Sequence, residues 1–289
     1  MNSTDLRPDD ILARSLNLTA LVAKASAAIL RFAGARPRHK ADGSPVTDAD
    51  EAAEAVILDG ISQLLPGIPV IAEESIARRA PPALDGAFVL VDPLDGTKEF
   101  IAGRDEYTVN LALISGRRPI AGFVAAPGRA LLWRGIVGHG AERLAIEGET
   151  VGAPQRIQVR HWPMSGAVAL VSRSHRDPAT EALLERLPPT RPESCGSSLK
   201  FCRIAEGAAD IYPRLGPTSE WDIAAGHAVV VAAGGIVTTP GGGPLTYGHA
   251  ERKFLVPAFI AWGDALKARN AHPFGAGHFR PPAGFDPVA

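Results

Sequence analysis

FVLVDPLDGT, residues 88–97, is a short apolar run followed at once by two aspartates in a turn that contains proline. Apolar runs of this length between turn residues are typical of buried strands. Glu73 and Glu74 follow a second such run, Val70-Ile71-Ala72, in the same way. Strand ends are where folds that combine helices and strands place functional groups. We therefore expect these carboxylates to converge on one site.

Convergent carboxylates repel one another, and removing them from water is costly, so a bound cation is the natural partner of such a cluster. The sequence has no His/Cys cluster with the spacing of a zinc site. Mg²⁺ and Mn²⁺ prefer carboxylates, waters and phosphate oxygens, so the acidic turns indicate phosphate chemistry. Gly96 and Thr97 follow Asp95 and could open a helical turn whose N–H groups bind phosphate.

Each of these turns also has an ordinary explanation. Asp-Pro and Asp-Gly are common turn dipeptides, and Glu-Glu before serine is often a solvated corner. Thr97 is equally suited to be a helix N-cap. It is the co-occurrence of the acidic turns that favours a site, and the residues alone leave both interpretations open.

The composition is that of an ordinary globular protein, with 289 residues of which 46% are hydrophobic and 21% charged. Thirty basic and 31 acidic residues leave a formal charge of −1, which argues against a nucleic-acid partner. No apolar run reaches the roughly 18 residues that cross a bilayer. With only two cysteines and no secretory signal, we expect a reducing cytoplasm, and association with the inner face of the cell membrane stays open.

The pattern of apolar residues divides the chain into two halves. The first half has helical periodicity at 9–32 and 47–65, with Thr47 and Asp50 spaced as a capping box, and then several short strands that predict an antiparallel or mixed sheet. The second half alternates strands and helices at 167–171, 179–187, 197–206, 209–212, 222–233 and 236–237. We predict an α+β half at 1–160, a smaller α/β half at 161–270 that completes the site, and a loosely ordered extension at 271–289.

Three ordered motifs carry a family resemblance. Ala72-Glu73-Glu74-Ser75, Asp92-Pro-Leu-Asp-Gly-Thr97 and Trp221-Asp222-Ile-Ala-Ala-Gly226 resemble the signatures of the inositol monophosphatase superfamily. Further stretches resemble the 3′(2′),5′-bisphosphate nucleotidases of sulfate assimilation, namely Lys40-Ala-Asp-Gly-Ser-Pro-Val-Thr47, Lys98-Glu-Phe-Ile101 and Gly196-Ser-Ser-Leu-Lys-Phe-Cys202. The resemblance implies a layered α-β-α-β-α sandwich and a lithium-sensitive magnesium phosphatase that binds two or three Mg²⁺ ions, with Mn²⁺ as a substitute.

The same resemblance implies a set of metal ligands: the carboxylates of Glu73, Asp92, Asp95 and Asp222, and the backbone carbonyl of Leu94. Asp222 shows how much the resemblance adds. By itself it has the appearance of an aspartate at a helix N-terminus.

The resemblance also implies the reacting and substrate-binding groups. Asp50 and Thr97 match the pair that positions and deprotonates the attacking water, although the capping box remains the alternative for Asp50. Glu74 either helps to hold a water at the metals or is a surface carboxylate. The residues matched to phosphate and nucleotide contacts are Gly96, Thr97, His175, Ser197, Lys200 and Arg214.

The function that follows is hydrolysis of 3′-phosphoadenosine 5′-phosphate to AMP and phosphate by in-line attack of water. Inositol monophosphate and fructose 1,6-bisphosphate are alternative substrates within the same fold. A non-catalytic protein that binds metal and phosphate is an alternative of another class. We expect a phosphorylated small molecule as the partner and no integral membrane segment. The possibility of a homodimer stays open.

Overall fold

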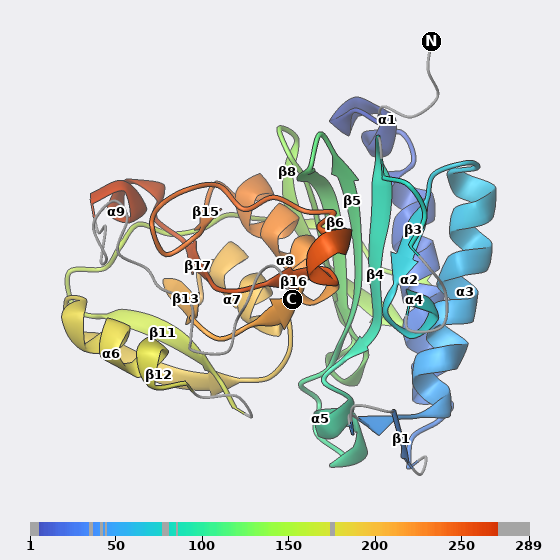
Figure 1. The fold of residues 1–289 in the computed structure, drawn as a ribbon, viewed down its shortest axis with the longest axis horizontal. Coiled ribbons are helices and arrows are strands. Elements are labelled where there is room, and N and C mark those ends of the chain that lie inside the picture. Colours follow the sequence, from blue (N-terminus) through green and yellow to red (C-terminus); the bar gives the residue numbers. More distant parts are fainter. Residues whose placement is uncertain are drawn as a thin grey trace.

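The computed structural model describes residues 6–34, 37–40, 43, 45–76, 81–84, 86–173 and 177–270. Its elements stack in the order α-β-α-β-α (Figure 1). Helices α2 (Ser15–Leu30) and α3 (Asp48–Leu64) cover one face of the larger sheet. Helices α7 (Leu199–Ala205) and α8 (Glu220–Ala232) lie between the two sheets. The outer face of the smaller sheet packs against α6 (Pro178–Arg186) and α9 (Ala265–Asn270), which confirms the predicted layered sandwich.

The larger sheet is mixed, as predicted. Its strand order is β10 (Gln155–Ile157), β8 (Gly140–Glu147), β7 (Leu131–Ile136), β6 (Arg118–Ala126), β5 (Thr108–Ser115), β4 (Phe88–Asp95) and β3 (Val70–Ala72), with β9 (Thr150–Val151) beside β8. The β3–β4 pair is parallel and the remaining pairs are antiparallel.

The smaller sheet has the order β12 (Thr190–Cys195), β11 (Ala167–Ser172), β13 (Ile211–Arg214), β17 (Phe259–Trp262) and β15 (Ile236–Thr238). Strands β12, β11 and β13 are parallel, whereas β17 runs antiparallel to both of its neighbours. The remaining elements are short: α1 (Pro8–Leu12), β1 (Arg38–His39), β2 (Pro45–Val46), α4 (Glu73–Ile76), α5 (Thr97–Ile101), η1 (Pro127–Arg129), β14 (Thr218–Ser219), η2 (Ala250–Arg252) and β16 (Leu255–Val256).

Strand β4 is apolar on both faces because helices cover both faces of its sheet. Phe88 and Leu90 enter the core shared with α7 and α8, whereas Val89 and Val91 enter the core under α2 and α3. Since side chains alternate along a strand, Asp92 follows Phe88 and Leu90 on the face toward α8. The parallel register pairs Ala72 of β3 with Val91. One residue further along both strands, the chain has Glu73 and Asp92.

The sequence prediction was wrong about some elements. The single helix expected at 9–32 is two helices, α1 and α2, because Arg14 leaves the helical conformation with φ −102° and ψ 0°. Apolar periodicity continues across this break and therefore did not reveal it. Strand β12 was also missed: its residues are largely polar and include Pro192, as in many edge strands. Strands β8, β9 and β10 were not predicted either.

Candidate active site

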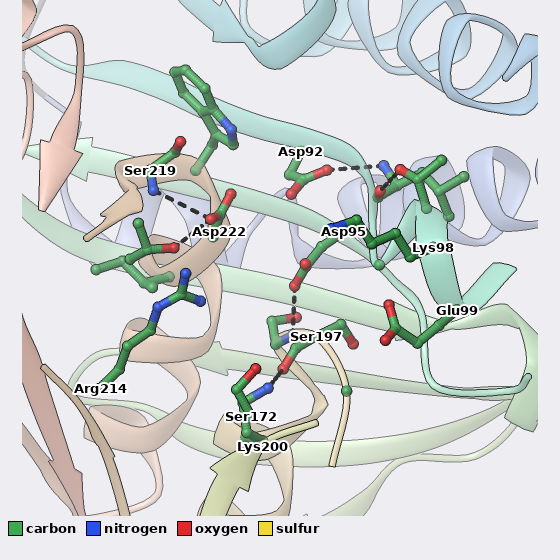
Figure 2. A pocket seen from close by; sticks show the side chains of 18 of the residues that line it. Asp92, Asp95, Lys98, Glu99, Ser172, Ser197, Lys200, Arg214, Ser219 and Asp222 are labelled. Carbon is green, nitrogen blue, oxygen red and sulfur yellow. Dashed lines mark hydrogen bonds between the residues drawn. The ribbon is translucent and has the colours of Figure 1, made fainter. Parts of the chain in front are cut away.

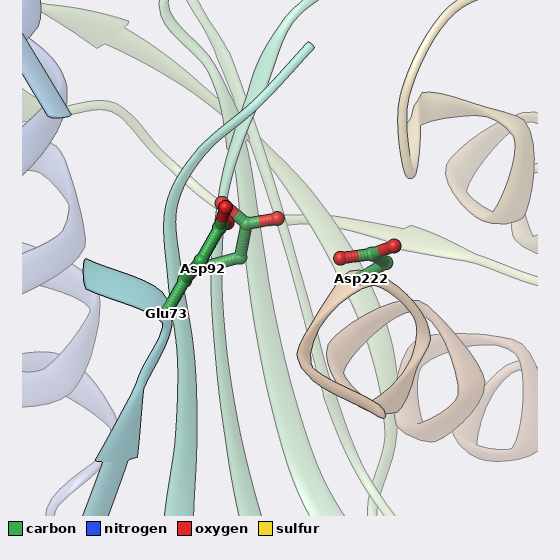
Figure 3. Close-up of side chains that lie close together, drawn as sticks. All are labelled: Glu73, Asp92 and Asp222. Carbon is green, nitrogen blue, oxygen red and sulfur yellow. The ribbon is translucent and has the colours of Figure 1, made fainter. Parts of the chain in front are cut away.

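Three carboxylates from distant parts of the chain meet between the layers. Glu73 follows β3, Asp92 belongs to β4, and Asp222 lies in the first turn of α8. One carboxylate oxygen from each lies within 4.8 Å of the other two. Figure 3 shows Asp222 facing the other two side chains from its helix. Among the described residues this is the one His/Cys/Asp/Glu group close enough to share a metal ion.

The electrostatics of this cluster favour a bound cation. Burial raises the pKa of Asp92 well above its usual range, and the charges of Glu73, Asp95 and Asp222 raise it further. Burial, with Asp222, raises the pKa of Glu73 to about 7 although Lys40 opposes the change. Burial, again with Asp222, raises the pKa of Asp95 to about 7. An all-oxygen set of this kind suits a hard divalent cation such as Mg²⁺.

Asp95 lines a cavity together with the three carboxylates, and the second half of the chain holds it in place. Its Oδ2 accepts a hydrogen bond of 2.6 Å from the backbone N–H of Ser198. The Ser198 hydroxyl lies 2.6 Å from Asn110 Oδ1 and 2.7 Å from Thr108 Oγ1, all three in the interior. Sequence reasoning missed these supporting residues. A polar Asn110 inside an otherwise apolar strand was the available signal.

The turn after Asp92 is an irregularity in the sheet. The register between β4 and β5 shifts between Asp92 and Asp95. The backbone N–H of Leu94 donates to Asp92 Oδ1 at 3.0 Å. The Leu94 carbonyl oxygen lies 3.1 Å from the hydroxyl of Thr97, and Leu94 also lines the cavity. The Leu94 carbonyl therefore contacts Thr97, and its role as a metal ligand stays a prediction.

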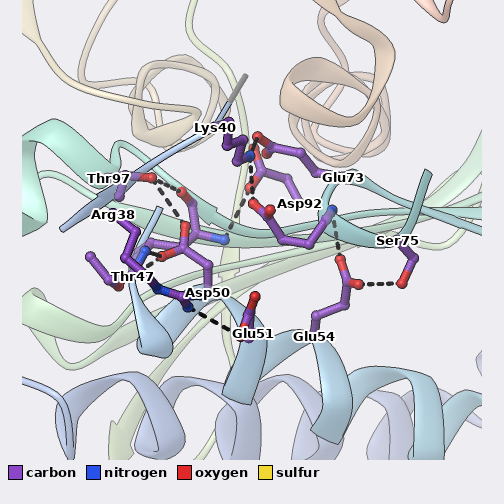
Figure 4. A network of polar contacts seen from close by, with 12 residues as sticks. Arg38, Lys40, Thr47, Asp50, Glu51, Glu54, Glu73, Ser75, Asp92 and Thr97 are labelled. Atoms are coloured by element: carbon purple, nitrogen blue, oxygen red, sulfur yellow. Dashed lines mark hydrogen bonds and ion pairs between the residues drawn. The ribbon is translucent and has the colours of Figure 1, made fainter. Parts of the chain in front are cut away.

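Asp50 acts as a helix cap and also contacts Thr97. Its Oδ2 accepts hydrogen bonds from the Thr47 backbone N–H at 2.8 Å and the Thr47 hydroxyl at 2.7 Å, which confirms the capping box of α3. Its Oδ1 lies 3.2 Å from the Thr97 hydroxyl (Figure 4). Burial raises the pKa of Asp50, and the hydrogen bonds from Thr47 oppose this rise. The Thr97 hydrogen can be donated to Asp50 or to Leu94, but to only one at a time.

Asp222 has the same dual character. Its Oδ2 accepts a hydrogen bond of 3.2 Å from the Ser219 backbone N–H and another from the Thr218 hydroxyl. The aspartate therefore caps α8, as its sequence context suggested. It also belongs to the carboxylate cluster.

Lys40 bridges the two glutamates and was not predicted as a site residue. Its Nζ lies 2.6 Å from Glu73 Oε1 and 2.6 Å from Glu74 Oε1. Burial of the ammonium opposes its charged form, but both glutamates together raise the pKa of Lys40. Glu74 is buried and not on the surface, so the surface interpretation of this residue was wrong. Its backbone N–H donates to Glu54 at 2.9 Å.

A cavity of about 450 Å³ joins the carboxylates to the predicted substrate residues (Figure 2). Its lining includes the predicted residues Gly96, Thr97, Ser197, Lys200 and Arg214. The predicted His175 lies outside the described residues.

The basic residues of the cavity also hold the backbone that forms its wall. Lys200 Nζ donates to the carbonyl oxygens of Cys195 at 3.1 Å and Ser197 at 2.6 Å. The Arg214 guanidinium donates to the backbone carbonyl oxygen of Pro217 at 3.0 Å. Lys200 and Arg214 both lower the pKa of Asp95, so their charges act on the carboxylate cluster.

Comparison with known proteins identifies the family. The model of the inositol monophosphatase family matches residues 14–272. The chain belongs to this family. Its relatives include the protein called 3′(2′),5′-bisphosphate nucleotidase CysQ from Escherichia coli O157:H7, 44% identical over 79% of this chain and 90% of that protein. The protein of the same description from Salmonella typhimurium is 45% identical over the same shares.

Solved structures agree with this membership. The crystal structure of CysQ from Bacteroides thetaiotaomicron, described as a bacterial member of the family, has a TM-score of 0.71 and 35% identity, over 86% of this chain and 97% of that one. An inositol monophosphatase from Anabaena has a TM-score of 0.72 over 91% of this chain and 95% of its own, at 24% identity. At that identity the likeness concerns the fold alone.

Proposed function

We propose that the chain is a Mg²⁺-dependent 3′(2′),5′-bisphosphate nucleotidase that converts 3′-phosphoadenosine 5′-phosphate to AMP and phosphate. The observation that carries the proposal is one cavity with two kinds of lining: buried carboxylates beside the Thr97–Asp50 pair, and the cations Lys200 and Arg214. A substrate with one phosphate to cleave and another to anchor matches such a lining. The names of the CysQ relatives support the same substrate class.

In this proposal Glu73, Asp92, Asp95 and Asp222 hold the metal ions together with the Leu94 carbonyl. Bound there, Mg²⁺ supplies Lewis-acid chemistry, which makes a water molecule more acidic and offsets negative charge on the phosphoryl group. The described carboxylates suit this role because one oxygen from each of three of them lies within 4.8 Å of the others. Burial and the neighbouring carboxylates oppose the ionised form of Asp92, which a bound cation would stabilise.

Thr97 and Asp50 form the proton path. When the Thr97 hydroxyl donates to Asp50 Oδ1, its lone pairs are free to accept a hydrogen bond from a water in the cavity. The water's proton passes to Thr97 Oγ1 as the Thr97 hydrogen moves to Asp50. The raised pKa of Asp50 makes its carboxylate a stronger base for this step. Glu74, held by Lys40, helps to orient the same water.

The basic and hydroxyl side chains of the cavity bind the substrate. Lys200 and Arg214 provide positive charge, and Ser197 adds a hydroxyl that has no hydrogen-bond partner among the described residues. Charge-assisted hydrogen bonds of this kind are the strong ones in phosphate recognition. The assignment of His175 to the nucleotide stays a prediction.

Rates of phosphate release in Mg²⁺ test the substrate. We expect kcat/KM for 3′-phosphoadenosine 5′-phosphate to exceed the values for inositol 1-phosphate and fructose 1,6-bisphosphate. A preference for the inositol phosphate would contradict the nucleotidase assignment. Absence of hydrolysis with all three substrates would favour a non-catalytic binding protein.

Two substitutions test the site residues. Asp50→Asn and Asp92→Asn should each lower kcat by about 100-fold or more, whereas Asp59→Asn, an exposed aspartate on the same helix as Asp50, should not. Without metal, Asp92→Asn should unfold at the same or a higher temperature, because a neutral amide replaces a buried carboxyl whose ionisation burial and the neighbouring carboxylates oppose. Its stabilisation by Mg²⁺ should largely disappear. A lower melting temperature without metal would attribute the lost activity to misfolding.

Several finer statements stay predictions: the number of Mg²⁺ ions, replacement by Mn²⁺, inhibition by Li⁺, a role in sulfate assimilation, a homodimer, and a cytoplasmic location or one at the inner face of the membrane. In the described part of the chain, none of the helices combines the length and the apolar character that a membrane span requires.

A further inference from the structure

Glu106 joins the two halves of the chain beside the cavity. It lies just before β5 of the larger sheet, and its side chain is 12% exposed. Arg173, which follows β11 of the smaller sheet, donates to it through two bonds: Nε to Oε2 at 3.0 Å and Nη2 to Oε1 at 3.1 Å. The Gly196 backbone N–H donates to the same Oε2 at 3.0 Å. One carboxylate therefore holds two segments that line the cavity.

The contact at Gly196 is too close for any other residue. A Cβ at this position would lie 2.7 Å from the Glu106 carbonyl oxygen and 2.9 Å from its Cβ. The next residue, Ser197, adopts the left-handed conformation with φ 46°, which is uncommon outside glycine. Glu106 thus fixes the turn that presents Ser197 to the cavity.

The Arg173 guanidinium still has donors to offer. It has five N–H groups. Its Nε and Nη2 groups contact Glu106, and Nη2 also donates to the Ser194 carbonyl at 3.3 Å. None of the hydrogen bonds among the described residues uses Nη1. A guanidinium group that binds a carboxylate along one edge can donate from its other edge to a phosphate oxygen.

Arg173 differs from the other cations of the cavity in the charges that surround it. Lys200 and Arg214 act electrostatically on the metal-site carboxylate Asp95. Glu106 has the largest effect on Arg173, followed by Cys195 and Glu99, and Glu99 lines the cavity too. The main negative partner of Arg173 is therefore Glu106 and not a carboxylate of the metal site.

We propose that Arg173 binds the phosphate that is not cleaved, and that Glu106 positions Arg173 and the Gly196–Ser197 turn for this contact. The inference rests on the proposed function, because it requires a substrate with two phosphates. Arg173 then determines specificity, since a nucleotide with only the reacting phosphate never reaches it. Glu106 is a positioning residue that acts through Arg173 and through the Gly196–Ser197 turn.

The test compares 3′-phosphoadenosine 5′-phosphate with adenosine 3′-monophosphate, which lacks the second phosphate. Arg173→Gln should lower kcat/KM for the bisphosphate by about 10- to 100-fold, mainly through KM, because it removes charged hydrogen bonds. The value for the monophosphate should change by less than about threefold. The matched control is Arg191→Gln, an exposed arginine on β12, which should leave both substrates unaffected.

Glu106→Gln tests the positioning role. It should raise KM for the bisphosphate while kcat stays within about threefold. The double variant should lose less discrimination than the sum of the two single losses, because residues that share an interaction are not additive. Calorimetric titration with adenosine 5′-monophosphate gives a readout that does not depend on turnover: its Kd should rise by the same factor as KM.

The outcomes separate the two proposals. If the unmodified enzyme does not prefer the bisphosphate, the proposed function fails. A second outcome is that the unmodified enzyme prefers the bisphosphate, and that Arg173→Gln keeps both this preference and the affinity for adenosine 5′-monophosphate. In that case the inference about Arg173 is overturned and the proposed function stands. Additive losses in the double variant would overturn the role of Glu106. Arg173 is partly exposed, at 38%, so its replacement is a fair test even if Glu106→Gln folds poorly.

Discussion

Asp50 and Asp222 each serve two purposes because a carboxylate has two oxygens and several acceptor positions. In Asp50 one oxygen caps α3 while the other contacts Thr97. In Asp222 one oxygen caps α8 while the residue joins the metal-site cluster. From the sequence, capping and function were competing explanations. At the scale of the residue they coexist, and the cap fixes the rotamer that the site needs.

A buried histidine predicts how stability depends on pH. Burial, together with the charge of Arg118, lowers the pKa of His227 to about 3, and its Nδ1 lies 2.7 Å from the Tyr247 hydroxyl. The folded protein keeps this ring neutral, while the unfolded chain takes up a proton below its ordinary pKa of about 6.5. Stability contributed by the neutral ring is therefore present above pH ~6.5 and falls as the pH decreases toward ~3, by about 1.4 kcal/mol per pH unit.

Urea denaturation between pH 7 and 4.5 measures this effect. His227→Gln keeps a hydrogen-bond acceptor for Tyr247 but does not titrate. It should be less stable at pH 7, and its free energy of unfolding should fall by about 2–3 kcal/mol less than that of the unmodified protein over this range. His161→Gln, which changes a ring that is 95% exposed, should keep the original slope. An unchanged slope in His227→Gln would mean that the buried ring is not neutral.

At the scale of elements, helix α8 carries Asp222 to the other carboxylates because it lies unusually close to the larger sheet. A Cβ on Gly122 of β6 would lie 2.1 Å from the Ala225 carbonyl oxygen. A Cβ on Gly135 of β7 would lie 2.6 Å from the Val229 Cα. Glycine at these two strand positions therefore sets the distance between the helix and the sheet.

Gly122→Ala should push α8 away from the sheet. We expect the free energy of unfolding to fall by about 1–3 kcal/mol, as for other overpacked cores. Mg²⁺ affinity, measured by calorimetry, should also weaken because Asp222 moves with its helix. Gly241→Ala is the control, since its Cβ would meet no atom within 4 Å. Full Mg²⁺ affinity in Gly122→Ala would show that the placement of Asp222 does not depend on this contact.

Across the whole molecule, the two predicted halves share one apolar core. Residues of β4 and β5 in the larger sheet, of α7 and α8, and of the smaller sheet belong to a single cluster of buried side chains. The carboxylate cluster also draws on both halves, with Glu73 and Asp92 from the first and Asp222 from the second. Whether residues 1–160 and 161–270 are separate domains can therefore be tested by measuring whether the two parts unfold together.

We predict a single unfolding transition. Tryptophan fluorescence, which reports on Trp133 in the larger sheet and on Trp262 in the smaller one, should change at the same urea concentration as far-ultraviolet circular dichroism. Mg²⁺ at 100 times its Kd should raise the free energy of unfolding by about 2.7 kcal/mol, and a chelator should reverse this. Two separate transitions, with only one sensitive to Mg²⁺, would identify independent domains.

Local sequence patterns were sufficient for features that depend on neighbouring residues. The apolar run before Asp92, the capping box of Thr47 and Asp50, and the ordered acidic motifs predicted the strand, the helix start and the family. Tertiary structure decided which side chains meet. The parallel register of β3 and β4, the close approach of α8, the Lys40 bridge and the Glu106–Arg173 pair all join residues far apart in the chain. Periodicity reports on the period and face of one element, whereas these contacts depend on how separate elements pack.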